Sequence, residues 1–140
     1  MDHPETDDMT SFYDFVITYT RADAFANGGL IDASTLANET GIRLPVALTA
    51  AVWHDCVTWT DADTEQTGIP QDETGRLWDV LFMARMRCGR GLKAGRSPFT
   101  IVRVARDATG PEPTLVKLDL HIGPGDDGEP VITIMFPEES

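Results

Sequence analysis

Two cysteines and three histidines are the side chains of this chain with the widest chemical range. His54, Asp55 and Cys56 follow one another in a stretch whose apolar spacing predicts a helix, where such neighbours point in different directions. No CxxC, HxxxH or HExxH spacing occurs, so we expect no bound metal and no cofactor. A nucleophilic pair of Cys56 with the distant His121 stays open, because the fold could bring them together. The simpler expectation is that Cys56 and Cys88 are buried, reduced thiols.

The segment Tyr19-Thr20-Arg21 suggests a second kind of chemistry, the binding of an anion. The polar triplet leaves a predicted strand, and Gly28-Gly29 then leads into a short extended stretch. This order resembles the opening of small ADP-ribosyltransferase-like folds, in which a polar residue at a strand end holds a nicotinamide dinucleotide. The resemblance implies an anion-binding role for Arg21 and a stacking role for Tyr19, although no catalytic glutamate accompanies them. The alternative is that Thr20 caps a helix and Arg21 lies on the surface.

Positive charge is concentrated in residues 76–106. This range holds eight arginines and lysines against Asp79 alone, whereas the whole chain has a net charge of −12. A basic segment surrounded by acidic ones predicts either a contact with an anionic ligand or ion pairs within the molecule. For an anionic ligand, the candidate residues are Arg90, Lys93 and Arg96.

A polar segment at 60–75 contains several carboxylates, and we expect it to be an exposed loop. Carboxylates on a surface can occupy a basic groove of another protein, because such grooves respond to the spacing of negative charge. The candidate residues for this contact are Asp61, Asp63 and Glu65. An acidic chain is not expected to bind nucleic acid directly.

The elements that must position these residues are clearest at the C-terminal end. Apolar, β-branched runs predict strands at 99–105, 114–122 and 131–136, and the turn residues between them predict antiparallel hairpins. The second turn, GPGDDG at 123–128, lacks the lysine of a phosphate-binding loop and precedes a strand rather than a helix. An apolar run at 12–19 predicts one further strand.

Two main helices are predicted at 49–59 and 74–88, the first capped by Thr49. Helical spacing of large apolar side chains indicates that both helices cover one face of the sheet. The side chains expected in the core are Trp53, Trp78, Leu81 and Phe82. The predicted fold is therefore α+β, with a single layer of mostly antiparallel sheet in which an N-terminal strand joins a C-terminal three-stranded meander.

Length and composition predict one domain. The chain has 140 residues, of which 41% are hydrophobic and 24% charged. These values are typical of a folded globular protein. We expect a disordered acidic tail at 1–11 and a single domain at 12–140. No run of 18 or more apolar residues and no basic, apolar leader occurs, which predicts a cytoplasmic protein without a membrane segment.

Four motifs, YTRADA, PVALTAAVWHDC, GRLWDVLFMAR and GPGDDGEPVITIM, give the chain a wider resemblance. Together they resemble a family of small bacterial proteins often found on plasmids and other mobile elements, from about Phe15 to Pro137. The resemblance implies an accessory context, such as conjugation or anti-restriction, and assigns no catalytic residue.

Two functional hypotheses follow. The first is a non-enzymatic accessory or anti-defence protein of a mobile element, which binds a protein partner through its acidic surface. The second is a small nucleotide-binding or ADP-ribosyltransferase-like enzyme that uses Arg21 and the basic segment 85–96. The acidic N-terminal half favours the first hypothesis, and the basic segment favours the second.

Overall fold

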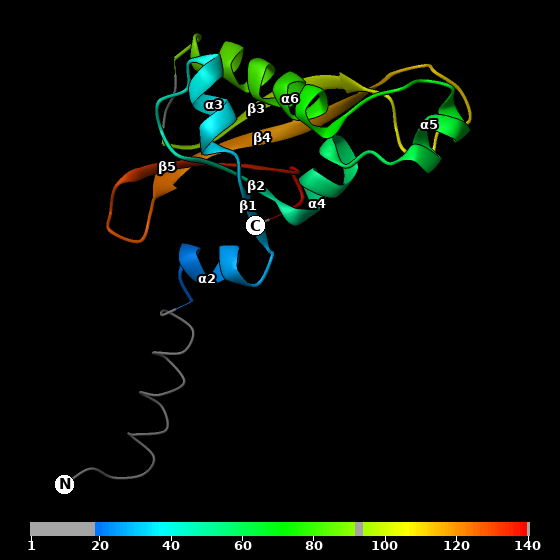
Figure 1. The fold of residues 1–140 in the computed structure, drawn as a ribbon. Helices are drawn as coiled ribbons and strands as arrows, with labels where there is room; N and C mark the ends of the chain where they lie inside the picture. The colour runs from blue at the N-terminus through cyan, green and yellow to red at the C-terminus, as the bar shows by residue number, and fades with distance from the viewer. Residues whose placement is uncertain (1–18, 92–93, 140) are drawn as a thin grey trace, which may run out of the picture.

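The computed structural model describes residues 19–91 and 94–139. It shows an open sheet with helices α3 (Ser34–Thr40) and α6 (Glu73–Cys88) on one face and helix α2 (Arg21–Ala26) on the other (Figure 1). The acidic tail predicted at 1–11 lies outside the described residues, as does the strand predicted at 12–19 except for Tyr19. No helix in the described ranges is both long and apolar enough to cross a membrane.

The sheet has five strands in the order β1-β2-β5-β4-β3. The strands are β1 (Leu30–Asp32), β2 (Val46–Thr49), β3 (Gly95–Arg103), β4 (Thr114–Pro124) and β5 (Pro130–Met135). Neighbouring strands are antiparallel except β2 and β5, which run parallel. The predicted α+β class and the C-terminal meander are confirmed.

The register of the meander places alternate side chains on opposite faces of the sheet. Ile101 pairs with Val116 on the face under α6, and Val102 pairs with Leu115 on the opposite face. The turn between β4 and β5 includes Gly128, whose φ of 82° suits glycine, so the segment GPGDDGEP forms the predicted hairpin.

The helices differ from the predicted ones in two places. The helix expected at 49–59 is α4 (Ala50–Val52) followed by a single π-helical turn, η1 (Trp53–Val57), and the Thr49 hydroxyl accepts the predicted cap hydrogen bond. The loop expected at 60–75 contains helix α5 (Asp61–Thr67). Thr60 and Asp63 form a reciprocal capping box at its start, a local signal that outweighs the polarity of the segment.

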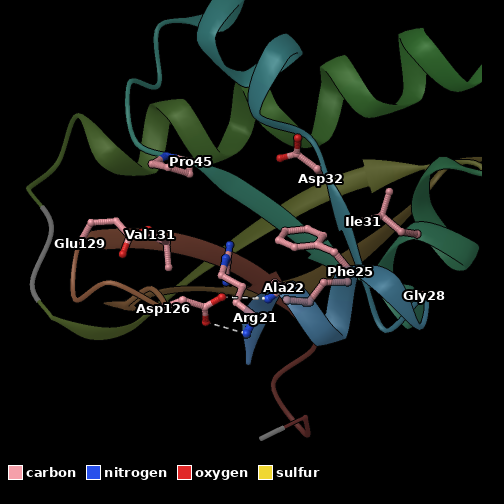
Figure 2. Close-up of a pocket in the computed structure, with 11 residues that line it drawn as sticks. Arg21, Ala22, Phe25, Gly28, Ile31, Asp32, Pro45, Asp126, Glu129 and Val131 are labelled. Carbon is pink, nitrogen blue, oxygen red and sulfur yellow. Dashed lines mark hydrogen bonds between the residues drawn. The ribbon is translucent and has the colours of Figure 1, made fainter. Parts of the chain in front are cut away.

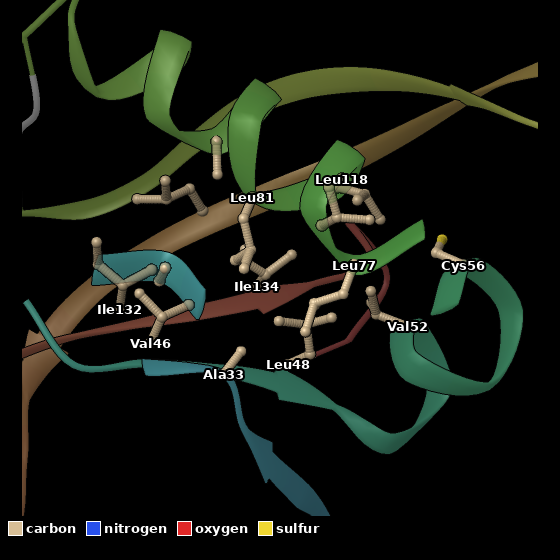
Figure 3. Close-up of a cluster of buried hydrophobic side chains, with 14 of the residues drawn as sticks. Ala33, Val46, Leu48, Val52, Cys56, Leu77, Leu81, Leu118, Ile132 and Ile134 are labelled. Carbon is tan, nitrogen blue, oxygen red and sulfur yellow. The ribbon is translucent and has the colours of Figure 1, made fainter. Parts of the chain in front are cut away.

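The core lies between the sheet and the helices α3 and α6 (Figure 3). Leu77, Val80, Leu81 and Ala84 form the buried face of α6. The prediction for Leu81 is confirmed, and Trp53 packs partly buried against the core. The prediction that Trp78 and Phe82 are core residues was wrong, because they lie on the opposite side of the same helix and are exposed.

Candidate functional site

Arg21 lies at a cavity of about 660 Å³ between α2, β1 and the β4–β5 turn (Figure 2). Its guanidinium group is already bound: Nη1 donates to Thr133 Oγ1 at 2.7 Å, and Nη2 donates to the Ile132 carbonyl at 2.9 Å. Burial lowers the pKa of Arg21 from its ordinary value, against the raising effect of nearby carboxylates such as Asp126. Arg21 therefore links α2 to β5.

The rim of this cavity is unsuited to a phosphate group. Asp32, Asp126 and Glu129 line it together with Arg21. Asp126 accepts hydrogen bonds from the backbone nitrogens of Arg21 and Ala22, at 2.7 and 3.0 Å, and so neutralises the start of α2. Three carboxylates around one cation repel a nucleotide.

Tyr19 takes part in a local contact near the same helix. Its side chain is 56% exposed, and its hydroxyl accepts a hydrogen bond from Asn27 Nδ2 at 2.6 Å. Thr20 and Asp23 form the predicted capping box. The Tyr19–Arg21 triplet thus matches the simpler alternative, a helix cap, with Arg21 partly buried rather than on the surface.

Among the described residues of the basic segment, Arg76 is the cation that is buried. It is 4% exposed, and its guanidinium stacks 4.5 Å from the centre of the Trp59 ring. It also donates four hydrogen bonds of 2.7–3.2 Å, to Gln71 Oε1 and to the carbonyls of Asp55, Val57 and Val104. Burial lowers the pKa of Arg76 from its ordinary value. This residue holds η1 and the end of β3 against α6.

Three other arginines of the basic segment form ion pairs with acids of the same chain. Arg103 Nη2 contacts both carboxylate oxygens of Asp55 at 3.0 and 2.9 Å, and Arg106 Nε contacts Asp63 Oδ2 at 2.9 Å. Arg96 Nη1 lies 3.2 Å from Asp119 Oδ2, and Arg96 also donates to the carbonyls of Pro137 and Glu139. Three cations of the basic segment therefore form the ion pairs within the molecule that one of the two sequence interpretations expected.

The three acidic candidates on α5 have different surroundings. Asp61 and Glu65 are exposed, whereas Asp63 is buried by its capping box and by Arg106. Burial acts to raise the pKa of Asp63, but the hydrogen bonds from Thr60 and Arg106 outweigh it and lower that pKa below its ordinary value. Only Asp61 and Glu65 can meet a partner directly, and a binding role for this acidic surface stays a prediction.

The nucleophilic pair considered for Cys56 does not form. Cys56 is 1% exposed in the core on one face of the sheet, whereas His121 lies on the opposite face, between Leu120 and Ile122 in β4. Burial, with a smaller effect of Asp55, raises the pKa of the Cys56 thiol to about 12, so the thiol is protonated at neutral pH. Within the described part of the chain, no cluster of three metal-binding side chains occurs.

The outer face of α6 exposes several large apolar side chains. Trp78, Phe82, Met83 and Met86 are 38%, 47%, 38% and 51% exposed. Trp78, Phe82 and Met86 are spaced four residues apart, so they follow one line along the helix. We call these four residues the outer apolar face. Surface patches of this kind mark interaction sites.

Beside the outer apolar face, a cavity of about 350 Å³ lies between α6 and β3. We call it the edge groove, since β3 is the last strand of the sheet. Arg87 spans the groove by donating to the Pro98 carbonyl at 3.2 Å. The residues that line it are Met83, Met86, Arg87, Arg90, Pro98, Phe99, Thr100 and Lys117.

The edge groove carries positive charge. Arg87, Arg90 and Lys117 line it, and none of them forms an ion pair with any acid among residues 19–91 and 94–139. Arg90 was a candidate for binding an anion, and here it lies beside two methionines. Lys93 lies outside the described residues, and Arg96 is used in the ion pair with Asp119.

The sequence did contain a signal for this surface. On a helical projection, Leu77, Leu81 and Ala84 lie on one side of α6, while Trp78, Phe82 and Met86 lie on the other. A helix with large apolar side chains all round either is fully buried or keeps one apolar face for a partner. The next element, β3, covers only one side of α6, which the sequence does not reveal.

Comparison with known proteins gives a family. A model for a family of unknown function, DUF6573, matches residues 9–140. No match was found among curated proteins or among solved structures. The matched range contains the whole described fold, including α6 and the edge groove. The chain is therefore a member of the DUF6573 family.

Proposed function

We propose that this chain is a protein-interaction domain, which binds an acidic, apolar segment of another protein in the edge groove and on the outer apolar face of α6. The single observation behind this proposal is that four large apolar side chains of one helix, Trp78, Phe82, Met83 and Met86, are exposed together. A lone exposed apolar residue is ordinary, whereas a group of this size favours burial by a partner.

Charge supports the choice of partner. Arg87, Arg90 and Lys117 border the methionines of the edge groove and are not neutralised by an acid of the described chain. A segment with apolar side chains alone would leave these cations unpaired at a partly dry interface, which is costly. A segment that alternates apolar and acidic residues covers the apolar side chains and also pairs with the cations.

The shape of the groove supports an extended or helical segment. The edge groove lies between helix α6 and the edge strand β3. One edge of β3 pairs with β4, and the groove lies at its other edge. Among residues 19–91 and 94–139, no strand pairs with the outer edge of β3. Peptides bind in such positions either by adding a strand to that edge or by placing an apolar helix face in the groove. Methionine side chains adapt to either shape.

The two residues that the sequence suggested for an enzymatic role, Arg21 and Cys56, favour binding over catalysis. The Arg21 guanidinium is held by Thr133 and Ile132, and the Cys56 thiol has a pKa raised to about 12. An accessory role on a mobile element, acting against another protein, is compatible with this proposal. The surface proposed for contact is α6 and the edge groove, in place of the acidic residues Asp61, Asp63 and Glu65.

A selection from a random peptide library displayed on phage tests the proposal. The purified chain is the target, and peptides that also bind the Met83→Ser/Met86→Ser variant are removed. We expect the remaining peptides to contain both acidic and large apolar residues, and to bind more weakly at high salt. They should also lose affinity for the Arg87→Glu/Arg90→Glu variant.

Matched controls lie elsewhere on the surface. Leu115 is 71% exposed, and Arg43 is also exposed, yet neither lines the edge groove. The Leu115→Ser and Arg43→Glu variants should therefore bind the selected peptides like the parent chain. Peptides without acidic residues, or equal loss of binding in the control variants, would refute the proposal.

A further inference from the structure

We infer that the partner segment binds as an amphipathic helix that lies antiparallel to α6, with its acidic residues in its first turn. This inference rests on the proposed function, because it names the conformation and the direction of the segment that the same surface binds. Three features of the described chain carry it: the outer edge of β3, the row of apolar side chains on α6, and the order of charges along that helix.

The outer edge of β3 carries a proline. Along a strand, successive residues turn their backbone groups to opposite edges. The Ile132 amide donates to the Pro45 carbonyl, on the β2 side of β5, at 2.8 Å. Followed through the register of β5, β4 and β3, this alternation directs the backbone groups of Ser97 toward β4 and those of Pro98 toward the outer edge.

Pro98 interrupts the hydrogen bonding that an added strand requires. Proline has no backbone N–H group, and the Pro98 carbonyl already accepts a hydrogen bond from Arg87 Nε at 3.2 Å. A proline and a cation at an edge strand both hinder pairing with a further strand. Of the two ways in which a peptide binds beside an edge strand, the packing of a helix is therefore favoured.

The outer apolar face has the form that a second helix needs. Trp78, Phe82 and Met86 follow one another at intervals of four residues, so they form a ridge about 12 Å long. Ridges of this spacing pack between the corresponding rows of side chains on a neighbouring helix. A partner helix of about three turns, or roughly 16 Å, covers the ridge.

The charges on this side of α6 change sign along the helix. Asp79, Met83 and Met86 are separated by four and three residues and share one side of α6. Asp79 is exposed, and it forms no ion pair with a cation of residues 19–91 and 94–139. Arg87 and Arg90 lie at the other end, where they line the edge groove. The outer apolar face is therefore acidic at its start and basic at its end.

A partner helix complements this order of charges when it runs antiparallel to α6. Carboxylates stabilise the first turn of a helix and cations the last turn, because of the helix dipole. In the antiparallel arrangement, the first turn of the partner lies beside Arg87 and Arg90, and its last turn lies beside Asp79. A parallel helix would place its acidic turn beside Asp79 and leave the two arginines unpaired.

Peptides from the phage selection test the conformation. The peptide used is one that binds the full parent chain but not the Met83→Ser/Met86→Ser variant. Alanine substitution along the peptide should lower its affinity at positions three and four residues apart, as on one face of a helix. α-Aminoisobutyric acid favours a helix and disfavours a strand. At peptide positions that tolerate alanine, it should tighten binding about threefold by restricting the free peptide.

Two results would overturn the helical conformation. One is loss of affinity at every second peptide position, which is the period of a strand, and the other is weaker binding after introduction of α-aminoisobutyric acid. Neither result would contradict the proposed function, which requires binding at Met83 and Met86 in any conformation. A selection that yields no such peptide would refute the proposed function instead.

Spin-labelled peptides test the direction. A nitroxide is attached to the first residue of one peptide and to the last residue of another, and each is bound to the full chain carrying ¹³C methionine methyl groups and ¹⁵N tryptophan indoles. The N-terminal label should broaden the Met86 signal more strongly than the Trp78 signal, and the C-terminal label should do the reverse. The same peptides with the nitroxide reduced give the reference intensities. Equal or opposite broadening would overturn the antiparallel placement.

Discussion

Trp78 and Leu81, three residues apart in α6, lie in opposite environments: Trp78 is 38% exposed, and Leu81 is completely buried. Leu81 is packed between the sheet and the helices, whereas Trp78 belongs to the outer apolar face. Under the proposed function, stability and binding depend on different sides of one helix. This separation allows each to be changed without the other.

Substitutions on the two sides of α6 should differ in their effect on stability. We expect Leu81→Ala to lower the free energy of unfolding by about 2–5 kcal/mol, because it leaves a cavity in the core. Phe82→Ala, at a side chain that is 47% exposed, should cost no more than about 1 kcal/mol. Urea unfolding of both variants measures the difference, and similar losses would place Phe82 in the core after all.

Arg76 should be required for stability rather than for binding. Its four hydrogen bonds join three backbone carbonyls and Gln71, and its guanidinium covers the Trp59 ring. We expect Arg76→Ala to lower the free energy of unfolding by roughly 3 kcal/mol, since buried acceptors lose a charged donor.

Comparison of Arg76→Lys with Arg76→Ala separates the effect of the charge from that of the hydrogen bonds. Lysine keeps the charge but lacks the planar fork that reaches several carbonyls at once. It should recover less than half of the stability lost in Arg76→Ala. Full recovery in thermal unfolding would mean that charge alone matters at this position.

Cys56 should react with thiol reagents far more slowly than a free cysteine. Burial raises the pKa of its thiol to about 12, and the side chain is 1% exposed. Because the folded chain keeps this proton more tightly, the associated stability is present below pH about 8.5 and is lost between there and about pH 12.

Native labelling with a thiol reagent at pH 8, followed by peptide mapping, measures the reactivity of each cysteine. Cys88 is only partly buried and should react first. In the unfolded chain the two cysteines should react at similar rates. Rapid labelling of native Cys56 would contradict both its burial and its raised pKa.

Asp63 should make folding depend on pH in the acid range. The hydrogen bonds from Thr60 and Arg106 lower its pKa in the folded chain, despite the opposing effect of burial. The stability due to this carboxylate is therefore present above its unfolded pKa of about 3.9, and it is lost as the pH falls through the lower folded value.

Asn in place of Asp63 keeps the shape and removes the charge. We expect Asp63→Asn to be less stable than the parent at pH 7, with the difference shrinking below pH about 4. Asp61→Asn, at an exposed neighbour in the same helix, should follow the parent at every pH. A constant difference between Asp63→Asn and the parent from pH 7 to pH 3 would mean that folding does not lower the pKa of Asp63, contrary to the effect of its hydrogen bonds from Thr60 and Arg106.

Most of the fold could be predicted from local signals in the sequence. Alternating apolar residues and Gly/Asp turns indicated the meander, and the caps at Thr20 and Thr49 marked two helix starts. The π-helical turn η1 carries no such local signal, and its carbonyls at Asp55 and Val57 accept hydrogen bonds from Arg76 of another helix, a contact that the sequence does not show.

The candidate site was harder to predict than the fold. Arg21, Arg96 and Asp63 looked available for ligands, but each has partners 23 or more residues away in the chain: Thr133, Asp119 and Arg106. The sequence cannot show such pairs. Trp78 and Phe82 looked like core residues because apolarity alone does not say which side of a helix meets the sheet.

Nuclear magnetic resonance of the methionine methyl groups tests the binding surface most directly. The chain contains five methionines, and among them Met83 and Met86 line the edge groove while Met135 is buried in β5. The chain is labelled with ¹³C at these methyl groups and titrated with a peptide that contains acidic and apolar residues, taken from the phage selection. Binding in the edge groove predicts that the Met83 and Met86 signals shift in proportion to bound peptide while the Met135 signal stays in place. Saturable binding that leaves Met83 and Met86 unchanged would contradict the assignment of this surface.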